Sequence, residues 1–402
     1  MKNNKLLLSQ KRFFSSVASQ KTKDDTVWMA PLSIVSSNSN KVEKFLLDNK
    51  SQKWSYSLSE ENESRSSWVK LNRNETSFVR IRYSDELLRL LKNPISSLNK
   101  KLSEEDRFGI VRDAFVLSEA GLLSTDRALD LVTAYTNDES YIVWAGIAGE
   151  VYKLNNILFK TTSYESFKKF VIKLFSPIYK KVGWEKAKNE EHGTTLLRGI
   201  VIGVMGRFGD IETIKKAQDL YEKDRNGKKK LEADLRGIVY VLVAENGDSK
   251  TYNTFLLAYE KETLEEERDR ILRALCAFTD KNLLRKTLQL SFSEKARSQD
   301  AAKTIMISAG NLYVRDIAWD FVKQQWEKIV EKYAGGHLYN RFVKPFGSFV
   351  TETDAKDIET FFKTHESKGL ERTLLQVTEQ IRSNAAWLER DKEKIENFLN
   401  AQ

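Results

Sequence analysis

The sequence has very few cysteine, proline and glycine residues, and each shortage limits what the protein can be. Its one cysteine, Cys276, cannot form a disulfide within the chain, and such usage favours a reducing compartment. Only 4 proline and 18 glycine residues occur in 402. Because both residue types interrupt helices, their scarcity over so long a chain favours a largely α-helical protein.

Histidine is also scarce, and the three residues His192, His337 and His365 are far apart in the sequence. His365 is followed by Glu366, the first half of the zinc-protease pattern H-E-x-x-H, but Gly369 stands where the second histidine must be. Since two imidazoles one helical turn apart are needed to reach one metal, we interpret this match as accidental. We expect no metal ligands and no catalytic residues in this chain.

Other patterns that carry chemistry are missing too. The sequence has no G-x-S-x-G elbow, no P-loop and no dinucleotide fingerprint. Gly199, Gly203, Gly206 and Gly209 lie in an apolar helical run, and we interpret them as sites of close helix packing. No apolar run approaches the roughly 18 residues that span a bilayer, so we expect no membrane partner.

The charge distribution argues against a nucleic-acid partner. The net charge is +9, from 66 basic and 57 acidic residues, but both signs are interspersed along the chain. This pattern is typical of solvated helix faces rather than of a phosphate-binding stripe. The densest basic run, 228–230, follows Asn226 and Gly227 and is expected to be a surface turn.

The pattern of apolar and polar residues changes near residue 85. Up to about residue 85, short runs of β-branched and aromatic residues alternate with polar ones, which predicts strands. These runs are 26–35, 53–58, 67–72 and 77–83. They predict a small N-terminal β-sandwich domain over 1–85.

From residue 86 to 402 the apolar period is helical. Ser103 and Asp106 have capping-box spacing and predict the start of a helix that covers 106–117. Turn and cap residues recur at 209–210, 247–248, 279–280 and 310–311, about one helical hairpin apart. The sequence therefore predicts a mainly α protein, with an α-α superhelix of armadillo or HEAT type after the β-sandwich. Cys276, in the apolar run 271–278, is expected to be a buried residue.

Several segments, taken in order, resemble the C-terminal half of the puromycin-sensitive zinc aminopeptidase family. They cover nearly the entire chain. The resemblance is carried by LSQKRFFSS (8–16), Trp28 with Pro31 and Leu32, WVKLNRNETSFVRIRY (68–83), DRFGIVRDAFVLSEAGLLS (106–124), YIVWAGI (141–147), LLRGIVIGVMGRFGD (196–210), AWDFVKQQWEKIVEKYAGG (318–336) and ERTLLQVTEQIRSNAAWLERD (371–391).

The resemblance implies a β-sandwich and a helical superhelix without the catalytic domain, whose zinc helix and G-A-M-E-N loop have no counterpart here. Zinc would then belong to the complete family, and this chain would bind no cofactor. An arginine that follows G-G-x-L in the family points into the peptide cavity, which implies a substrate-binding role for Arg341. An ordinary structural role, at a helix end or beside an acid, stays open for Arg341. The neighbouring Tyr339 and Phe342 could face substrate, but we assign them to packing.

The resemblance suggests a scaffold that encloses peptide substrates and has no hydrolytic activity alone, with a catalytic aminopeptidase domain as a possible partner in trans. Two alternatives stay open: a helical protein-interaction module without a peptidase role, and a fragment of a complete metalloaminopeptidase. We expect a cytoplasmic protein. The alternative is a mitochondrial one, because 1–23 is basic, serine-containing and free of acids before Asp24. The strand-like resemblance of 8–16 competes with that interpretation.

Overall fold

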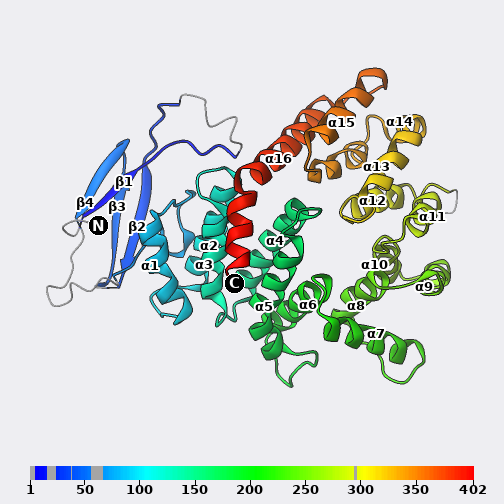
Figure 1. Cartoon of the computed structure of the whole chain (residues 1–402), viewed down its shortest axis with the longest axis horizontal. Helices are drawn as coiled ribbons and strands as arrows, with labels where there is room; N and C mark the ends of the chain where they lie inside the picture. Colours follow the sequence, from blue (N-terminus) through cyan, green and yellow to red (C-terminus); the bar gives the residue numbers. More distant parts are fainter. Residues whose placement is uncertain (1–4, 16–23, 38, 56–66, 294–296) are drawn as a thin grey trace. The chain divides into compact units, whose positions relative to one another are not determined.

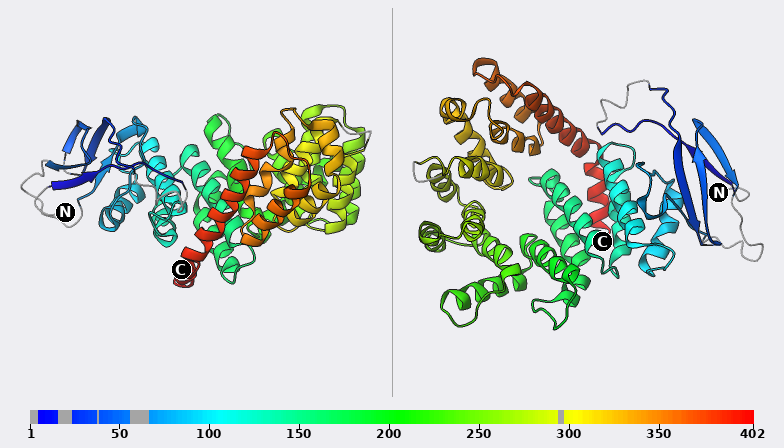
Figure 2. Two further views of the ribbon diagram at one scale, coloured as in Figure 1. Left: turned by 90° about the horizontal axis from the view of Figure 1, so that it is seen from above. Right: turned by 180° about the vertical axis from the view of Figure 1, so that it is seen from behind.

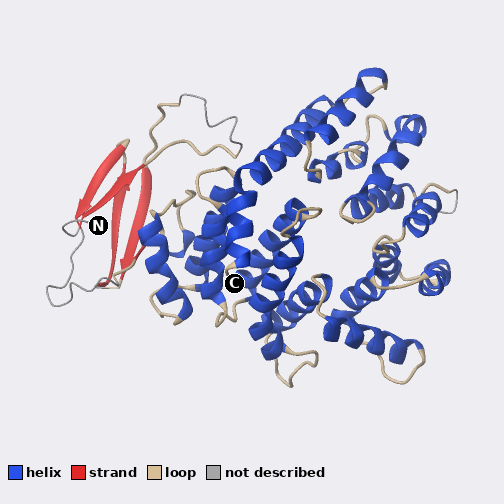
Figure 3. Ribbon diagram, in the orientation of Figure 1, coloured by secondary structure: helices blue, strands red, loops and turns tan. Residues whose placement is uncertain are grey.

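A computed structural model describes residues 5–15, 24–37, 39–55, 67–293 and 297–402. Within these ranges every strand lies before residue 72, and helices make up most of the rest (Figures 1 and 3). The strands are β1 Lys5–Ser9, β2 Ala30–Ser36, β3 Ser39–Leu47, β4 Ser51–Ser55 and β5 Val69–Leu71. The predicted fold class, mainly α after a small N-terminal β region, is confirmed.

The strands form two small antiparallel sheets. One has the order β1-β4 and the other the order β3-β2-β5. In β1, Leu6 and Leu8 are buried while Leu7 between them is exposed, as the two-residue period of a strand requires. The sheets contact each other where the ring of Phe45 in β3 stacks on that of Trp54 in β4, with centroids 4.4 Å apart.

The strand predicted at 77–83 is wrong. The backbone there has no strand partner among the described residues. Hydrogen bonds to side chains replace those that a neighbouring strand would make. The N–H of Ile81 donates to Asp113 over 2.8 Å, and the Tyr83 hydroxyl accepts from the N–H of Leu71 over 3.1 Å. Of the strand predicted at 53–58, residues 56–58 lie outside the described residues, as do 1–4 and 16–23 of the basic N-terminal run.

The α-helices of the described chain begin at residue 85. The α-helices of the described chain are α1 Asp85–Ser96, α2 Glu104–Glu119, α3 Thr125–Val132, α4 Tyr141–Leu158, α5 Tyr164–Val182, α6 His192–Arg207, α7 Ile211–Arg225, α8 Ala233–Glu245, α9 Ser249–Lys261, α10 Glu265–Leu275, α11 Lys281–Ser291, α12 Ser298–Ala309, α13 Arg315–Gln324, α14 Trp326–Tyr333, α15 Glu352–Thr364 and α16 Glu371–Asn400. Short 3-10 helices are η2 Arg73–Glu75, η3 Thr133–Tyr135, η4 Tyr339–Phe342 and η5 Lys344–Ser348.

Local capping explains where many of these helices begin. Ser103 and Asp106 form the predicted capping box at the start of α2. Asp210, Asp248 and Asp280 cap α7, α9 and α11, and each carboxylate accepts a hydrogen bond from a backbone N–H two or three residues later. The predicted joints between helices are therefore confirmed at these positions.

The glycine prediction holds only in part. Close helix packing is wrong for Gly209, which follows α6 with a φ of +97° and where an added Cβ would meet no atom within 4 Å. A Cβ on Gly206 of α6 would come within 2.6 Å of the methyl groups of Leu242 of α8, so the two helices pack closely here and a larger residue would require Leu242 to shift. Cys276 directly follows α10 and is fully buried, as predicted.

The chain divides into two compact units. The first comprises 1–153, 173–197 and 389–402, and the second comprises 154–172 and 198–388. The division predicted between residues 85 and 86 stays a prediction.

In the first unit the last turns of α16 lie beside α2 and α3 (Figures 1 and 2). The guanidinium of Arg390 donates to the carbonyl of Ser118 over 2.6 Å. Asp391, which is 1% exposed, accepts hydrogen bonds from Thr125. The end of the chain is thus part of the core of this unit.

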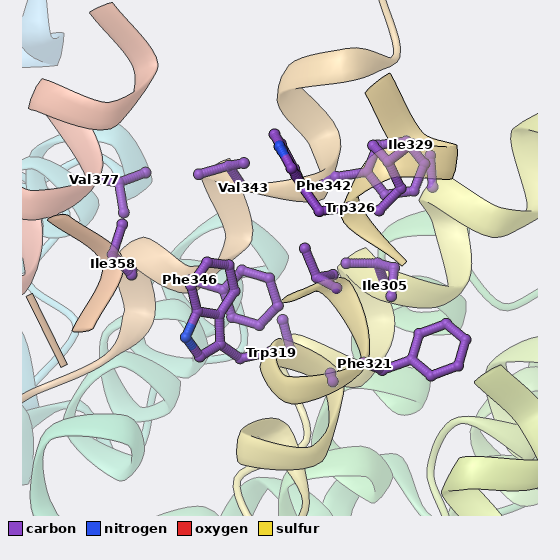
Figure 4. Close-up of a cluster of buried hydrophobic side chains, with 14 of the residues drawn as sticks. Ile305, Trp319, Phe321, Trp326, Ile329, Phe342, Val343, Phe346, Ile358 and Val377 are labelled. Atoms are coloured by element: carbon purple, nitrogen blue, oxygen red, sulfur yellow. The ribbon is translucent and has the colours of Figure 1, made fainter. Parts of the chain in front are cut away.

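The second unit has an aromatic core at its C-terminal side (Figure 4). Trp319 and Phe346 lie side by side with ring centroids 5.0 Å apart. The indole N–H of Trp319 donates to Asp357 over 2.6 Å, which gives its polar edge a partner. This core carries the segment in which the candidate site residue Arg341 lies.

Candidate functional site

The segment between α14 and α15 is built from glycine turns and short helices. Gly335 has a φ of +76°, a left-handed conformation that glycine adopts without strain. A Cβ on Gly336 would lie 3.2 Å from the carbonyl of Tyr333, which is tighter than ordinary contact. The two glycines therefore end α14 and turn the chain into η4.

The apolar residues of η4 anchor it to the core. Tyr339 is 3% exposed and its ring stacks on Trp326 with centroids 5.7 Å apart. Phe342, which Figure 4 labels, is fully buried. Its ring lies against that of Tyr333, with centroids 4.7 Å apart. The assignment of Tyr339 and Phe342 to packing is confirmed. Burial also raises the pKa of the Tyr339 hydroxyl to about 12.

Arg341 lies between these two anchors in η4, and its side chain is exposed. Its backbone N–H bonds to the carbonyl of Leu338 over 3.0 Å. The guanidinium has no hydrogen bond or ion pair with any residue in the part of the chain that the structure describes. His337 and Lys344, on the same segment, are also exposed. A planar fork of donors held on a rigid turn suits a carboxylate or a peptide carbonyl.

A second arginine, Arg315, was not identified from the sequence. It begins α13, is 6% exposed, and forms no ion pair with a carboxylate in the described ranges. Nη1 donates to Asn156 Oδ1 over 2.5 Å and to the Ser348 carbonyl over 3.3 Å, while the guanidinium lies over the ring of Phe349. Burial lowers the pKa of Arg315 below its ordinary value. The only sign in the sequence that Arg315 is buried is its position just before an apolar helical run.

The three histidines are separate and exposed. His192 begins α6, and His337 lies in the glycine turn. His365 follows α15, stacks on Phe361 with ring centroids 3.9 Å apart, and its Nδ1 lies 2.8 Å from the Phe361 carbonyl. Among the described residues no group of three or more His, Cys, Asp or Glu side chains converges on a point where a metal could bind. These donors do not fit a zinc site.

Cys276 does not have the surroundings of a catalytic nucleophile. The thiol is fully buried, and burial raises its pKa to about 12. Since the thiolate is the reactive form, this thiol is inert in the folded protein.

Two features bear on macromolecular partners. Lys228, Lys229 and Lys230 are exposed in the turn after α7, as predicted. No helix in the described ranges combines the length and the apolarity needed to cross a bilayer.

The chain is thus a succession of packed helices that follows a small β region in the sequence. The chain belongs to the ERAP1-like C-terminal domain family, whose model matches residues 68–383. Aminopeptidase M1 of Arabidopsis thaliana is 31% identical over 417 residues, which covers 98% of this chain and 46% of that protein. Aminopeptidase M1-C of Oryza sativa subsp. japonica is 30% identical over 375 residues, covering 90% of this chain and 42% of that protein.

Human glutamyl aminopeptidase is 26% identical over 401 residues, covering 98% of this chain and 41% of that protein. The chain thus spans less than half the length of these relatives, and the predicted resemblance to the C-terminal region of aminopeptidases is confirmed.

Proposed function

We propose that this chain is the non-catalytic, peptide-enclosing part of an aminopeptidase, and that hydrolysis is performed by a zinc-bearing catalytic part. The main support for this proposal is how much of each protein takes part in the alignment. Nearly all of the chain aligns with less than half of Aminopeptidase M1, and the matching family model is described as a C-terminal domain. The catalytic part would be a separate polypeptide or a preceding segment of a longer protein.

The geometry of Arg341 supports a peptide-binding role within this proposal. Its guanidinium is exposed and has no partner among the described residues, while the residues on both sides of it are locked in the core. The backbone of Arg341 is thus fixed, and its guanidinium is available to a peptide carbonyl or terminal carboxylate. The one cysteine is a buried free thiol, which fits the cytosolic location that we propose.

The test uses two purified polypeptides. One is the full chain, and the other is the part of Arabidopsis Aminopeptidase M1 that lies outside the matched region. Hydrolysis of leucine p-nitroanilide and of a nonapeptide is measured for each polypeptide and for their mixture, with added zinc. We expect no turnover by the chain alone, and a saturable increase in nonapeptide hydrolysis when the chain is titrated into its partner.

Two results would overturn the proposal. Turnover by the chain alone, at a rate that survives a second purification, would show that it is itself an enzyme. A mixture whose rates equal those of the catalytic part alone for both substrates would show that the chain neither binds that part nor encloses its peptides.

A further inference from the structure

The guanidinium of Arg315 is a buried cation without a counterion. The residue is 6% exposed, and no carboxylate in the described ranges forms an ion pair with it. Taking a cation out of water is costly unless a negative charge lies against it. The contacts of this group therefore show which partner it has and which it lacks.

One nitrogen of the guanidinium is held by contacts within the chain. Nη1 donates to Asn156 Oδ1 over 2.5 Å and to the Ser348 carbonyl over 3.3 Å. Asn156 Nδ2 donates to the same carbonyl over 2.7 Å, which fixes the amide. The guanidinium carbon lies over the ring of Phe349, 5.4 Å from its centroid. These contacts fix the position of the group, but each of them is made to a neutral partner.

The other edge of the guanidinium has no partner. Nε is buried and makes no hydrogen bond, and Nη2 makes none with any residue that the structure describes. In arginine the Nε–H and Nη2–H bonds point to the same side of the plane, and their spacing matches the two oxygens of a carboxylate. The open edge of Arg315 thus has the geometry for two parallel hydrogen bonds to a carboxylate.

The carboxylates nearest in their effect on Arg315 are committed elsewhere. Burial lowers the pKa of Arg315, and Asp316 and Asp354 are near enough to oppose this shift. Asp316 is paired instead with Lys160 at 3.6 Å, and its side chain is 64% exposed. Asp354 Oδ2 accepts from the N–H of Thr351 over 3.0 Å in the capping box of α15. Neither carboxylate therefore fills the open edge.

The position of Arg315 in the fold also favours an anion. It is the first residue of α13, and Val314 before it supplies no side-chain cap. The N-terminal end of a helix carries a partial positive charge, so it disfavours a cation and favours an anion. Because so little of Arg315 is exposed, an ion pair made there would be shielded from water and stronger than one at the surface.

We propose that the open Nε–Nη2 edge of Arg315 is a binding site for a carboxylate group. The site goes beyond the proposed function, because it needs only this chain and no catalytic part. Two sources carry the same chemistry, a free small carboxylate and the terminal carboxylate of a peptide. A spherical anion such as chloride cannot accept both hydrogen bonds in the same parallel geometry.

The experiment follows the melting temperature of the full chain as sodium succinate is added, in comparison with sodium chloride at the same ionic strength. A ligand that binds only the folded protein raises the melting temperature, and the dependence on its concentration gives the Kd. We expect a progressive rise with succinate that chloride does not reproduce.

Two peptides identify the source of the carboxylate. One is a nonapeptide with a free C-terminal carboxylate, and the other is the same nonapeptide as a C-terminal amide. A larger rise with the acid than with the amide would identify a peptide terminus as the ligand. Equal effects of the two peptides, together with a rise with succinate, would identify a free carboxylate.

Substitutions of Arg315 test its role directly. Arg315→Met keeps a side chain of similar length without charge, and the Kd for succinate should rise about tenfold or more. Arg315→Lys should recover only part of the affinity, because lysine lacks the planar fork. The matched control is Arg285→Met on α11, since Arg285 is exposed and also donates to an asparagine, Asn282 Oδ1, over 3.2 Å. Its Kd should stay within about twofold of wild type.

A further variant keeps the arginine in place. Asn156→Asp preserves the shape of the amide and puts a counterion against Nη1, so it should weaken succinate binding about fivefold or more. Equal effects of succinate and chloride on the wild-type chain would overturn the site. Wild-type affinity in Arg315→Met, or in Asn156→Asp if the methionine variant does not fold, would also overturn it. Arg315 would then serve only as a brace between α4 and η5.

Discussion

The hydroxyl of Thr125 donates a hydrogen bond to Asp391 Oδ2 over 2.6 Å, although 266 residues separate the two in sequence. The N–H of Thr125 also reaches this oxygen, over 3.3 Å. Ser124, the N-cap residue of α3, makes no capping bond with its own side chain. The cap of α3 is therefore supplied by the last turns of α16.

We expect Asp391→Ala to lower the free energy of unfolding by about 1–3 kcal/mol, because the N–H of Thr125 loses its hydrogen bond to this buried carboxylate and Arg390 loses its ion pair. Urea unfolding followed by circular dichroism measures this. Glu389→Ala is the matched control on the same helix, since that side chain is 77% exposed and pairs with Lys392. Its effect should stay within about 0.5 kcal/mol. Equal losses in both variants would contradict the capping role.

Gly109 of α2 lies so close to a neighbouring side chain that one added carbon atom would clash. A Cβ there would lie 2.1 Å from the carboxyl carbon of Glu75, which Lys70 and Arg112 hold in place. We expect Gly109→Ala to destabilise the protein by roughly 1–3 kcal/mol in urea unfolding, as overpacking does.

Gly149 of α4 provides the control, because a Cβ there would meet no atom within 4 Å. Gly149→Ala should raise stability by about 0.5–1 kcal/mol, through helix propensity alone. A stabilising effect at both positions would mean that Glu75 moves aside at little cost.

The stability of the protein should depend on Cys276 in alkaline solution. Burial raises the pKa of this thiol from its ordinary value of 9.0 to about 12. Between these pH values the unfolded chain loses the thiol proton and the folded chain keeps it, so stability falls as the pH rises. From pH 8 to pH 10 the loss of stability from this group should be about 1.4 kcal/mol.

The measurement compares urea unfolding of wild type and Cys276→Ala between pH 8 and pH 10. The variant removes the thiol and leaves other alkaline titrations in place, so its curve should fall less steeply. Parallel pH profiles would show that the thiol ionises normally in the folded protein.

Arg341→Ala should weaken binding of a fluorescein-labelled nonapeptide by about tenfold, because a charge-assisted hydrogen bond is worth about 1.5–3 kcal/mol. Arg341→Lys should recover only part of the affinity, since lysine keeps the charge and lacks the planar fork. Fluorescence anisotropy reports the binding. Arg372→Ala, an exposed arginine in the first turn of α16, is the control with unchanged affinity. If both alanine variants bind alike, Arg341 does not contact peptide.

Features that depend on residues close together in the chain could be predicted from the sequence. Asp210, Asp248 and Asp280 could be identified as caps because their hydrogen-bond partners are two or three residues away. Cys276 could be identified as buried from the apolar run around it.

Features that depend on distant residues could not be predicted in this way. Phe78 lies in a run with strand-like alternation, and only the side chains of Asn72 and Asp113 reveal that the run forms a braced turn. Arg315 looks like a surface arginine because its partner Asn156 is 159 residues away. A candidate site of this kind is determined by tertiary neighbours, which residue spacing does not encode.

The hydrogen bonds at the two ends of the family match have a practical consequence for anyone who shortens the protein. A polypeptide trimmed to residues 68–383 would keep β5 but discard β2, whose residues 34–36 pair with it. It would also discard Trp387 and Asp391, both buried. The segment that the family model matches is therefore shorter than the segment that is expected to fold alone. A protein prepared for expression should keep the residues on both sides of 68–383.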